Sequence, residues 1–194
     1  MNFRMKIIIL GAILMISFSG CSGKMKYERY AATDPKLNLS MDYISGWTHK
    51  VQYGSLDSFV QVVFYAPGRK NNTFEGMMVV TVRDSSKAGF SPRTIDGMLS
   101  DLIRKYMKYD SAKVVSKTRK DILGEDAFTI EFSFRSLNSF DSKKAKIVPM
   151  KERIVIFQKD DKFYTIRYEI LAENFDKYEK AFAHIVKSIK FDSR

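Results

Sequence analysis

The segment Phe128-Thr129-Ile130-Glu131-Phe132-Ser133-Phe134 carries the strongest pattern in the chain. Large apolar side chains alternate in it with polar ones, and such alternation places the two sets on opposite faces of a β-strand. Four large apolar side chains on one face are stable only under a cover of other apolar residues. The segment therefore predicts a principal core strand of a domain built around a β-sheet.

The flanking sequence shows two kinds of apolar period. Alternating or continuous apolar runs predict strands at 37–43, 47–53, 59–66, 77–82, 113–123, 152–158 and 163–171. Apolar residues at helical spacing predict two amphipathic helices, one opened by Ser91-Pro92 with Ser91 as N-cap and one capped by Asn174. Short turns, including 124–126 and 160–161, favour antiparallel neighbours. The order predicts an α+β fold, an α/β/α sandwich whose mainly antiparallel sheet is flanked by two long helices.

The first twenty-one residues have the features of an export signal. Two basic residues precede an apolar run over 7–18, and Ser19-Gly20 stands directly before Cys21. The run is shorter than the roughly 20 apolar residues of a membrane-spanning helix, and the pattern is typical of a secretory signal peptide. Cys21 is the only cysteine, and its setting resembles the lipobox of bacterial lipoproteins, with Phe18 where Leu is usual.

Three regions follow from this interpretation. Residues 1–20 are expected to be a lipoprotein signal peptide, residues 21–33 a lipid-anchored tether, and residues 34–194 one globular domain. An acyl chain such as palmitate on Cys21 would hold the domain on a membrane of the bacterial cell envelope, facing the periplasm or the exterior. An ordinary cleaved signal and an uncleaved anchor are the alternatives, and docking of Tyr27 and Tyr30 on the domain would shorten the tether.

The side-chain inventory argues against most catalytic chemistry. The chain has two histidines, and it contains no Gly-rich phosphate loop, no HExxH and no GxSxG. His49 is expected to be partly buried and hydrogen-bonded, and His184 to face solvent. The acidic pairs 125–126 and 160–161 are interpreted as turn residues. We therefore expect no catalytic residue, no cofactor and no metal site, and keep a hydrolase with an unrecognised site as an alternative.

The net charge of +11 raises the question of an anionic partner. Nucleic acid fits poorly with an exported protein, so lipid head groups, envelope polymers or acidic proteins are the candidates. Lys143, Lys144 and Lys146 share a loop and are the expected contact with an anionic surface. The alternative is that the basic residues only form ordinary solvated faces and contact no anionic partner.

Several segments resemble the PsbP/Mog1-like fold family. They are 41–47 (MDYISGW), 62–67 (VVFYAP), 122–128 (ILGEDAF) and the hairpin 154–168 with the helix that runs to Phe191. Asp161 stands where the family's hairpin usually turns at glycine. The resemblance implies the same sandwich. Plant and cyanobacterial members assist photosystem II, DcrB-like lipoproteins share the fold, the Mog1 branch binds a small GTPase, and none of these groups is known as an enzyme family.

The function expected from the sequence is a non-catalytic, lipid-anchored envelope protein with a binding, accessory or assembly role. Its partners would be the membrane, through lipidated Cys21, and an anionic lipid or an envelope protein. A small-ligand or transport-accessory module, with a pocket between sheet and helix, is one alternative. A photosystem II accessory protein, in a phototrophic host, is another.

Overall fold

The computed structural model describes residues 25–54, 58–67, 75–84, 94–137 and 145–191. Along these ranges, five strands precede the first helix, four strands separate the two helices, and a short strand follows the second helix. The strands are β1 (Tyr27–Ala31), β2 (Leu39–Ile44), β3 (Thr48–Tyr53), β4 (Val60–Tyr65), β5 (Gly76–Asp84), β6 (Lys113–Ile122), β7 (Glu125–Leu137), β8 (Ile147–Lys159), β9 (Lys162–Leu171) and β10 (Lys190–Phe191). The helices are α1 (Ile95–Tyr106) and α2 (Phe175–Ser188), with a 3-10 turn at Ala172–Asn174 before α2.

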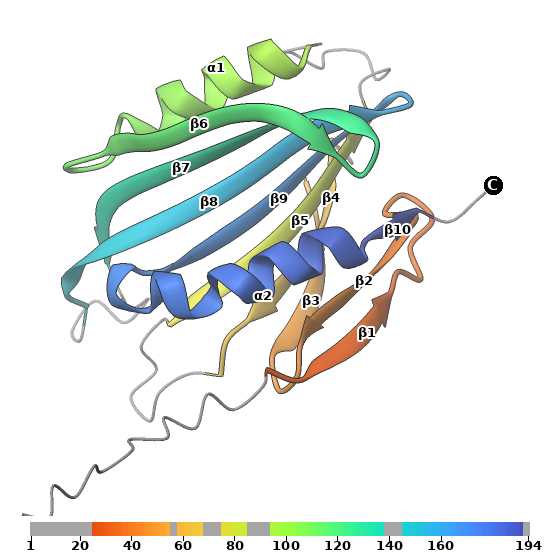
Figure 1. The fold of residues 1–194 in the computed structure, drawn as a ribbon, viewed down its shortest axis with the longest axis horizontal. Helices are drawn as coiled ribbons and strands as arrows, with labels where there is room; N and C mark the ends of the chain where they lie inside the picture. Colours follow the sequence, from red (N-terminus) through yellow and green to blue (C-terminus); the bar gives the residue numbers. More distant parts are fainter. Residues whose placement is uncertain (1–24, 55–57, 68–74, 85–93, 138–144, 192–194) are drawn as a thin grey trace, which may run out of the picture.

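Seven strands form one antiparallel sheet in the order β3-β4-β5-β9-β8-β7-β6, and β1-β2-β10 form a small second sheet. In Figure 1, α1 lies along one face of the large sheet, while α2 lies on the other face beside the small sheet. The predicted α+β architecture, a mainly antiparallel sheet between two long helices, is confirmed. None of the helices in the described ranges is long and apolar enough to cross a membrane.

The predicted core strand is confirmed in β7. Phe128, Ile130, Phe132 and Phe134 are all buried in the core beneath α1. Phe132 has no exposed surface, and its ring stacks on that of Tyr106 in α1 with 4.3 Å between centroids. Ala127 points to the opposite face and belongs to the core beneath α2. Strand β7 is therefore buried on both sides, and the large sheet separates two cores.

The core beneath α2 ties the helix to β9. Phe182 stacks on Tyr168 with 5.4 Å between ring centroids, and the Tyr168 hydroxyl donates a hydrogen bond of 3.0 Å to the Phe175 carbonyl. Burial of Phe175, Phe182 and Ile185 fixes the apolar stripe that the sequence predicts for this helix. The position of α2 over β9 is thus set by large aromatic side chains.

The predicted boundary between a tether over residues 21–33 and a domain that begins at residue 34 is wrong. Residues 27–31 form β1, which pairs with β2, and Tyr30 is buried against Phe64 with 5.4 Å between ring centroids. Arg29 adds an ion pair of 3.0 Å to Asp42. The folded domain therefore begins near Tyr27 and not at Asp34, which matches the alternative in which the tyrosines dock.

The helix starts also differ from prediction. The side chain of Thr94 accepts a hydrogen bond of 3.1 Å from the Gly97 amide, so Thr94 is the N-cap of α1. Ser91, the predicted cap, lies outside the described residues. Asn174 does precede α2, but its side chain makes no capping hydrogen bond.

Truncating Phe132 should cost far more than changing its neighbour on the other face. We expect Phe132→Ala to lower the free energy of unfolding by about 3–5 kcal/mol, because a large ring leaves a cavity that the sheet cannot close. Thr129→Val keeps the side-chain shape, and the Thr129 hydroxyl has no hydrogen-bond partner in the described structure, so it should cost little. Urea unfolding measures both. Equal losses would mean that the two faces of β7 are misassigned.

Candidate functional site

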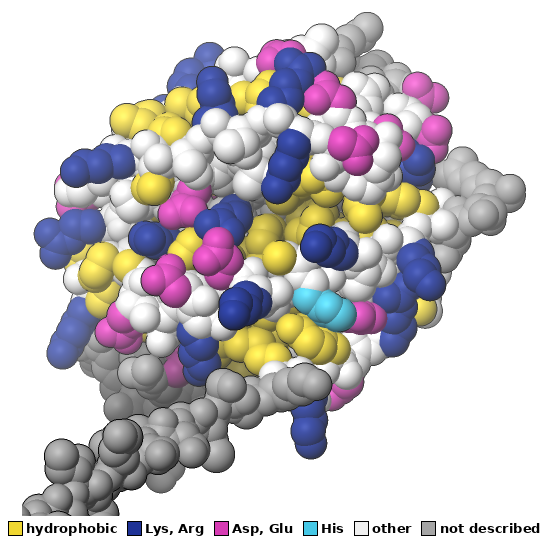
Figure 2. All heavy atoms as spheres, viewed as in Figure 1, with side chains coloured by type: hydrophobic (Ala, Val, Ile, Leu, Met, Phe, Trp, Pro, Cys, Tyr) yellow, Lys and Arg dark blue, Asp and Glu magenta, His cyan; other side chains and the backbone are white. Residues whose placement is uncertain are grey.

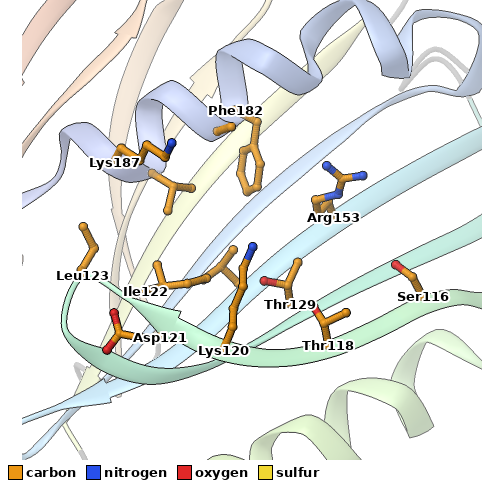
Figure 3. Close-up of a pocket in the computed structure, with 13 residues that line it drawn as sticks. Ser116, Thr118, Lys120, Asp121, Ile122, Leu123, Thr129, Arg153, Phe182 and Lys187 are labelled. Carbon is orange, nitrogen blue, oxygen red and sulfur yellow. The ribbon is translucent and has the colours of Figure 1, made fainter.

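A pocket of about 470 Å³ lies between α2 and the part of the large sheet formed by β6, β7 and β8. It exists because α2 packs over β9, whereas β6 is the edge strand three places away in the sheet. Figure 3 shows the pocket lined from below by β6 and from above by α2. Its volume falls in the range of about 300–1,000 Å³ typical of small-ligand sites.

The floor of the pocket is apolar. Val155, Phe182 and Val186 line it and are almost fully buried. Thr129 lies between Thr118 of β6 and Val155 of β8 in the strand registers. Its hydroxyl oxygen is buried and has no hydrogen-bond partner among the described residues. A buried hydroxyl without a partner is uncommon in proteins, so this oxygen is a natural contact for a ligand.

The walls are polar on both sides. Register pairs Ser116, Thr118 and Lys120 with Glu131, Thr129 and Ala127, which places this β6 face toward α2. All three β6 side chains line the pocket, as does Lys187 of α2. In Figure 3 the Lys120 side chain reaches from β6 toward α2. The pocket is therefore an apolar slot with hydroxyls and lysines along its rim.

One end of the pocket is closed by the turn between β6 and β7. The turn residues are Leu123 and Gly124, with φ of 60° and 80°, and not the predicted 124–126. Glu125 and Asp126 instead open β7. A two-residue turn with both φ positive matches the twist of a hairpin and favours Asn-Gly, so Leu123 is strained there. The strained leucine contributes an apolar side chain to the pocket wall.

The cations of the pocket differ in whether they are already paired. Arg153 donates to Glu131 at 2.8 Å and to Glu179 at 2.7 Å. Lys120 and Lys187 make no ion pair with any described residue. Asp121, the only carboxylate among the lining residues, accepts from the Gly124 amide at 3.2 Å. The lining thus holds three cations and one carboxylate, and its two lysines have no ion-pair partner among the described residues, so the rim is positive.

A second cluster of charges lies on the opposite face, beneath α1. Glu152 is fully buried and accepts hydrogen bonds from the Tyr106 hydroxyl and, at 2.5 Å, from Nε of Arg167. Arg167 also donates to the Tyr106 oxygen at 3.1 Å and approaches Glu169 at 3.4 Å. Because each group already has partners, this cluster anchors α1 to the sheet.

The cluster perturbs the acid–base behaviour of two members. Burial, reinforced by the charge of Glu152, raises the pKa of the Tyr106 hydroxyl far above its usual value. Burial and the same carboxylate raise the pKa of Glu169 to about 7, and Arg167 and Lys105 offset part of that rise. The Glu169 carboxyl is thus protonated in the folded protein at mildly acidic pH.

The histidines are placed only partly as expected. The prediction that His49 is partly buried is wrong: it is exposed, and its ring lies 5.2 Å from Tyr30, 5.7 Å from Tyr43 and 5.7 Å from Phe64 between centroids. His184 is 47% exposed, in agreement with the prediction, and one ring nitrogen lies 2.9 Å from Asp42. Among the described residues, no group of three or more His, Cys, Asp or Glu could hold a metal ion.

The acidic pairs have structural partners. Glu125 accepts from Lys159 at 2.8 Å, and Asp126 pairs with Arg119. Asp160, with φ of 51°, occupies the two-residue turn between β8 and β9 with Asp161, as predicted. Turn and ion-pair chemistry therefore account for these carboxylates.

The structure describes one of the four residues selected from the sequence. Cys21, Lys143 and Lys144 lie outside the described residues, and Lys146 is exposed just before β8. Next to it stand two large apolar residues that the sequence analysis missed, Leu137 at 59% and Ile147 at 57% exposure, which pair across β7 and β8.

The surface around Lys146 continues around the end of the sheet. We define the exposed end as the apolar and basic residues where α1 ends, β6 begins and β7 meets β8. Its exposed apolar residues are Met107, Tyr109, Val114, Val115, Leu137 and Ile147, and its exposed cations are Lys108, Lys113, Arg135 and Lys146. A backbone hydrogen bond of 3.0 Å from Arg135 to Asp110 joins the α1–β6 turn to β7. Figure 2 shows Lys and Arg interspersed with hydrophobic side chains along this left-hand end.

Comparison with known proteins identifies the fold. The family model described as PsbP matches residues 30–191. The solution structure of cyanobacterial PsbP (CyanoP) from Synechocystis sp. PCC 6803 is similar, with a TM-score of 0.58 and 16% identity over 94% of this chain and 98% of that chain. The crystal structure of PA94 from Pseudomonas aeruginosa, a protein of unknown function, has a TM-score of 0.53 and 12% identity over 87% and 99% of the two chains. Among curated proteins, no match was found.

The raised pKa of Glu169 predicts a specific pH dependence. The folded state holds a proton that the unfolded chain, with its usual pKa of 4.5, releases at lower pH, so the free energy of unfolding falls as pH rises from about 4.5 to about 7. Glu169→Gln should remove this loss. The free energy of unfolding of the variant, relative to that of the unchanged protein, should therefore be higher at pH 8 than at pH 4.5. Urea unfolding at both pH values measures the difference.

Glu173→Gln is the matched control, because Glu173 is an exposed residue in the turn before α2. The free energy of unfolding of Glu173→Gln should differ from that of the unchanged protein by the same amount at both pH values. A Glu169→Gln effect that is independent of pH would contradict the assignment.

Proposed function

The chain belongs to the PsbP family, and from that premise we propose that it is a non-catalytic binding or accessory protein, held on a membrane of the bacterial cell envelope by a lipid on Cys21. The observation that carries the proposal is the exposed end, where apolar and basic side chains are mixed on one surface. Such a mixture is what an anionic membrane surface selects, since apolar groups enter the interface and cations face the head groups.

The position of β1 supports this arrangement. Because the folded domain begins at Tyr27, only residues 21–26 separate it from the proposed lipid. Six residues span at most about 22 Å. The domain would therefore stay close to the membrane, and this favours a surface that touches lipid over one that reaches a distant partner.

The basic residues contribute only when they face the membrane closely. A lysine or arginine near an anionic surface contributes about 1 kcal/mol, and screening at physiological salt acts over about 8 Å. Lys143, Lys144 and Lys146 lie within four residues of the exposed Ile147 in the sequence, which is why we propose them as contacts with the head groups.

The buried carboxylate Glu152 supports a non-catalytic role. It already accepts hydrogen bonds from Tyr106 and Arg167, which hold it in a structural network.

A small-ligand module is the second candidate function. The observation that favours it is the pocket beneath α2, with its apolar floor and unpaired lysines. The two functions are compatible, because the pocket and the exposed end comprise different residues.

Replacing Cys21 should abolish lipid attachment. We expect Cys21→Ala to leave an unprocessed precursor that is not labelled by a clickable fatty acid, because the thiol is the proposed acceptor and the chain has no other cysteine. Metabolic labelling followed by gel fluorescence measures this, with Ser22→Ala as the control that should keep full labelling. Undiminished labelling of Cys21→Ala would refute the anchor.

The domain from Ser22 onward should bind vesicles that contain anionic lipid, and binding should weaken sharply from low to high salt. We expect the triple change Lys143→Gln, Lys144→Gln and Lys146→Gln to reduce binding by at least tenfold. Co-sedimentation with vesicles of neutral or mixed lipid measures it.

The matched control changes three exposed lysines away from this end to glutamine: Lys50 on β3 at the opposite edge of the sheet, Lys190 on β10, and Lys36, whose carbonyl accepts from Lys162 at the start of β9. It has the same net charge as the test variant and should bind nearly as well as the unchanged domain. Equal loss in both variants would show that only net charge matters, and binding that ignores vesicle charge would overturn the proposed surface.

A further inference from the structure

We propose that the pocket beneath α2 binds a small amphiphile with one carboxylate or phosphate head and an unbranched apolar body. The proposal goes beyond membrane attachment, because it assigns a ligand class to a site that takes no part in the exposed end. It rests on the shape of the pocket, the chemistry of its floor and the charge of its rim.

The floor selects an apolar body. Val155, Phe182 and Val186 form a surface that is continuous with the core beneath α2. Ile122 and Leu123 extend this apolar surface along the wall at the β6–β7 turn. In Figure 2, hydrophobic side chains are visible between α2 and β6, with Lys or Arg on both sides. An alkyl chain laid on this surface would be removed from water along most of its length.

The rim selects an anionic head. Lys120 on β6 and Lys187 on α2 stand on opposite walls, and neither is paired with a described carboxylate. An anion placed between them would gain two charge-assisted contacts without breaking any existing ion pair. Arg153 is excluded from this role because Glu131 and Glu179 already hold its guanidinium.

Two further features favour a ligand over simple hydration of the slot. The Thr129 hydroxyl is buried at the floor without a protein partner, and Ser116 and Thr118 continue a row of hydroxyls along the same wall. Leu123 occupies a strained turn position where Asn or Gly would relax the backbone. The turn thereby holds an apolar side chain that both packs against the core beneath α2 and lines the pocket, where it can contact an apolar ligand.

The ligand class is tested with decanoate, decyl phosphate and decanol. Each compound, kept below its own aggregation concentration, is titrated calorimetrically into the domain from Ser22 onward. We expect at least one of the two anions to bind in a single site, at least tenfold more tightly than decanol. The tighter anion identifies the head group. Absence of binding by both anions at millimolar concentration, or equal binding of decanol, would overturn the proposal.

The site is tested with Lys120→Gln combined with Lys187→Gln, which should weaken binding of the preferred anion at least tenfold and leave decanol binding unchanged. Both lysines are exposed, so the melting temperature should not move. Lys117→Gln is the matched control, because Lys117 lies on the same strand but pairs with Ile130, whose side chain faces α1. Equal affinities of the double variant and Lys117→Gln would overturn the site.

These measurements are independent of the membrane proposal. The double variant retains Lys143, Lys144 and Lys146 and should bind anionic vesicles almost as well as the unchanged domain. If the double variant loses decanoate binding but still binds anionic vesicles, the result supports the ligand site in the pocket and leaves the membrane proposal to its own test. Loss of decanoate binding in the Lys143, Lys144 and Lys146 variant, with none in the pocket variant, would place the amphiphile at the exposed end and refute the pocket.

Discussion

Burial of the central strands on both faces is the constraint on which the rest of the structure depends. Strands β7, β8 and β9 bury large side chains alternately toward α1 and toward α2, as Phe132 and Phe157 show. Apolar area of this size must be covered on each side, and two helices with the small sheet supply the cover. The charged cluster on the α1 side is tolerated because Glu152, Arg167 and Tyr106 satisfy one another.

The two covers are not equivalent, and the difference creates the pocket. Helix α1 contacts β7 and β8 near the β6 side of the sheet, whereas α2 contacts β2 and β9. On the α2 side the edge strand β6 is therefore left without a helix above it, and its inward row of Ser116, Thr118 and Lys120 lines a slot. Lys113, Lys117 and Arg119 add charge along the same strand, and cationic side chains on an edge strand oppose pairing with another chain.

The sequence was informative where side chains repeat and uninformative where distant segments meet. Alternation over 128–134 predicted β7, and the apolar runs on both sides of 160–161 predicted the β8–β9 hairpin. Strand β1 was missed because Tyr27–Ala31 is short and mostly polar, and because pairing with β2 and the contact of Tyr30 with Phe64 join segments that are distant in the sequence. His49 was misplaced because the alternation over 47–53 does not reveal that β3 is an edge strand, where His49 is exposed. A pocket between sheet and helix was among the alternatives, but its lining could not be predicted, since Lys120, Thr129 and Lys187 converge only through β-register and helix packing.

The central claim, that the pocket beneath α2 is a ligand site, is tested most directly by nuclear Overhauser effects between protons of bound decanoate and the protein. The account predicts contacts from the alkyl chain to the Phe182 ring and to the methyl groups of Val155 and Val186, which line the floor. Contacts confined to Leu137 and Ile147, at the opposite end of the surface, would contradict it.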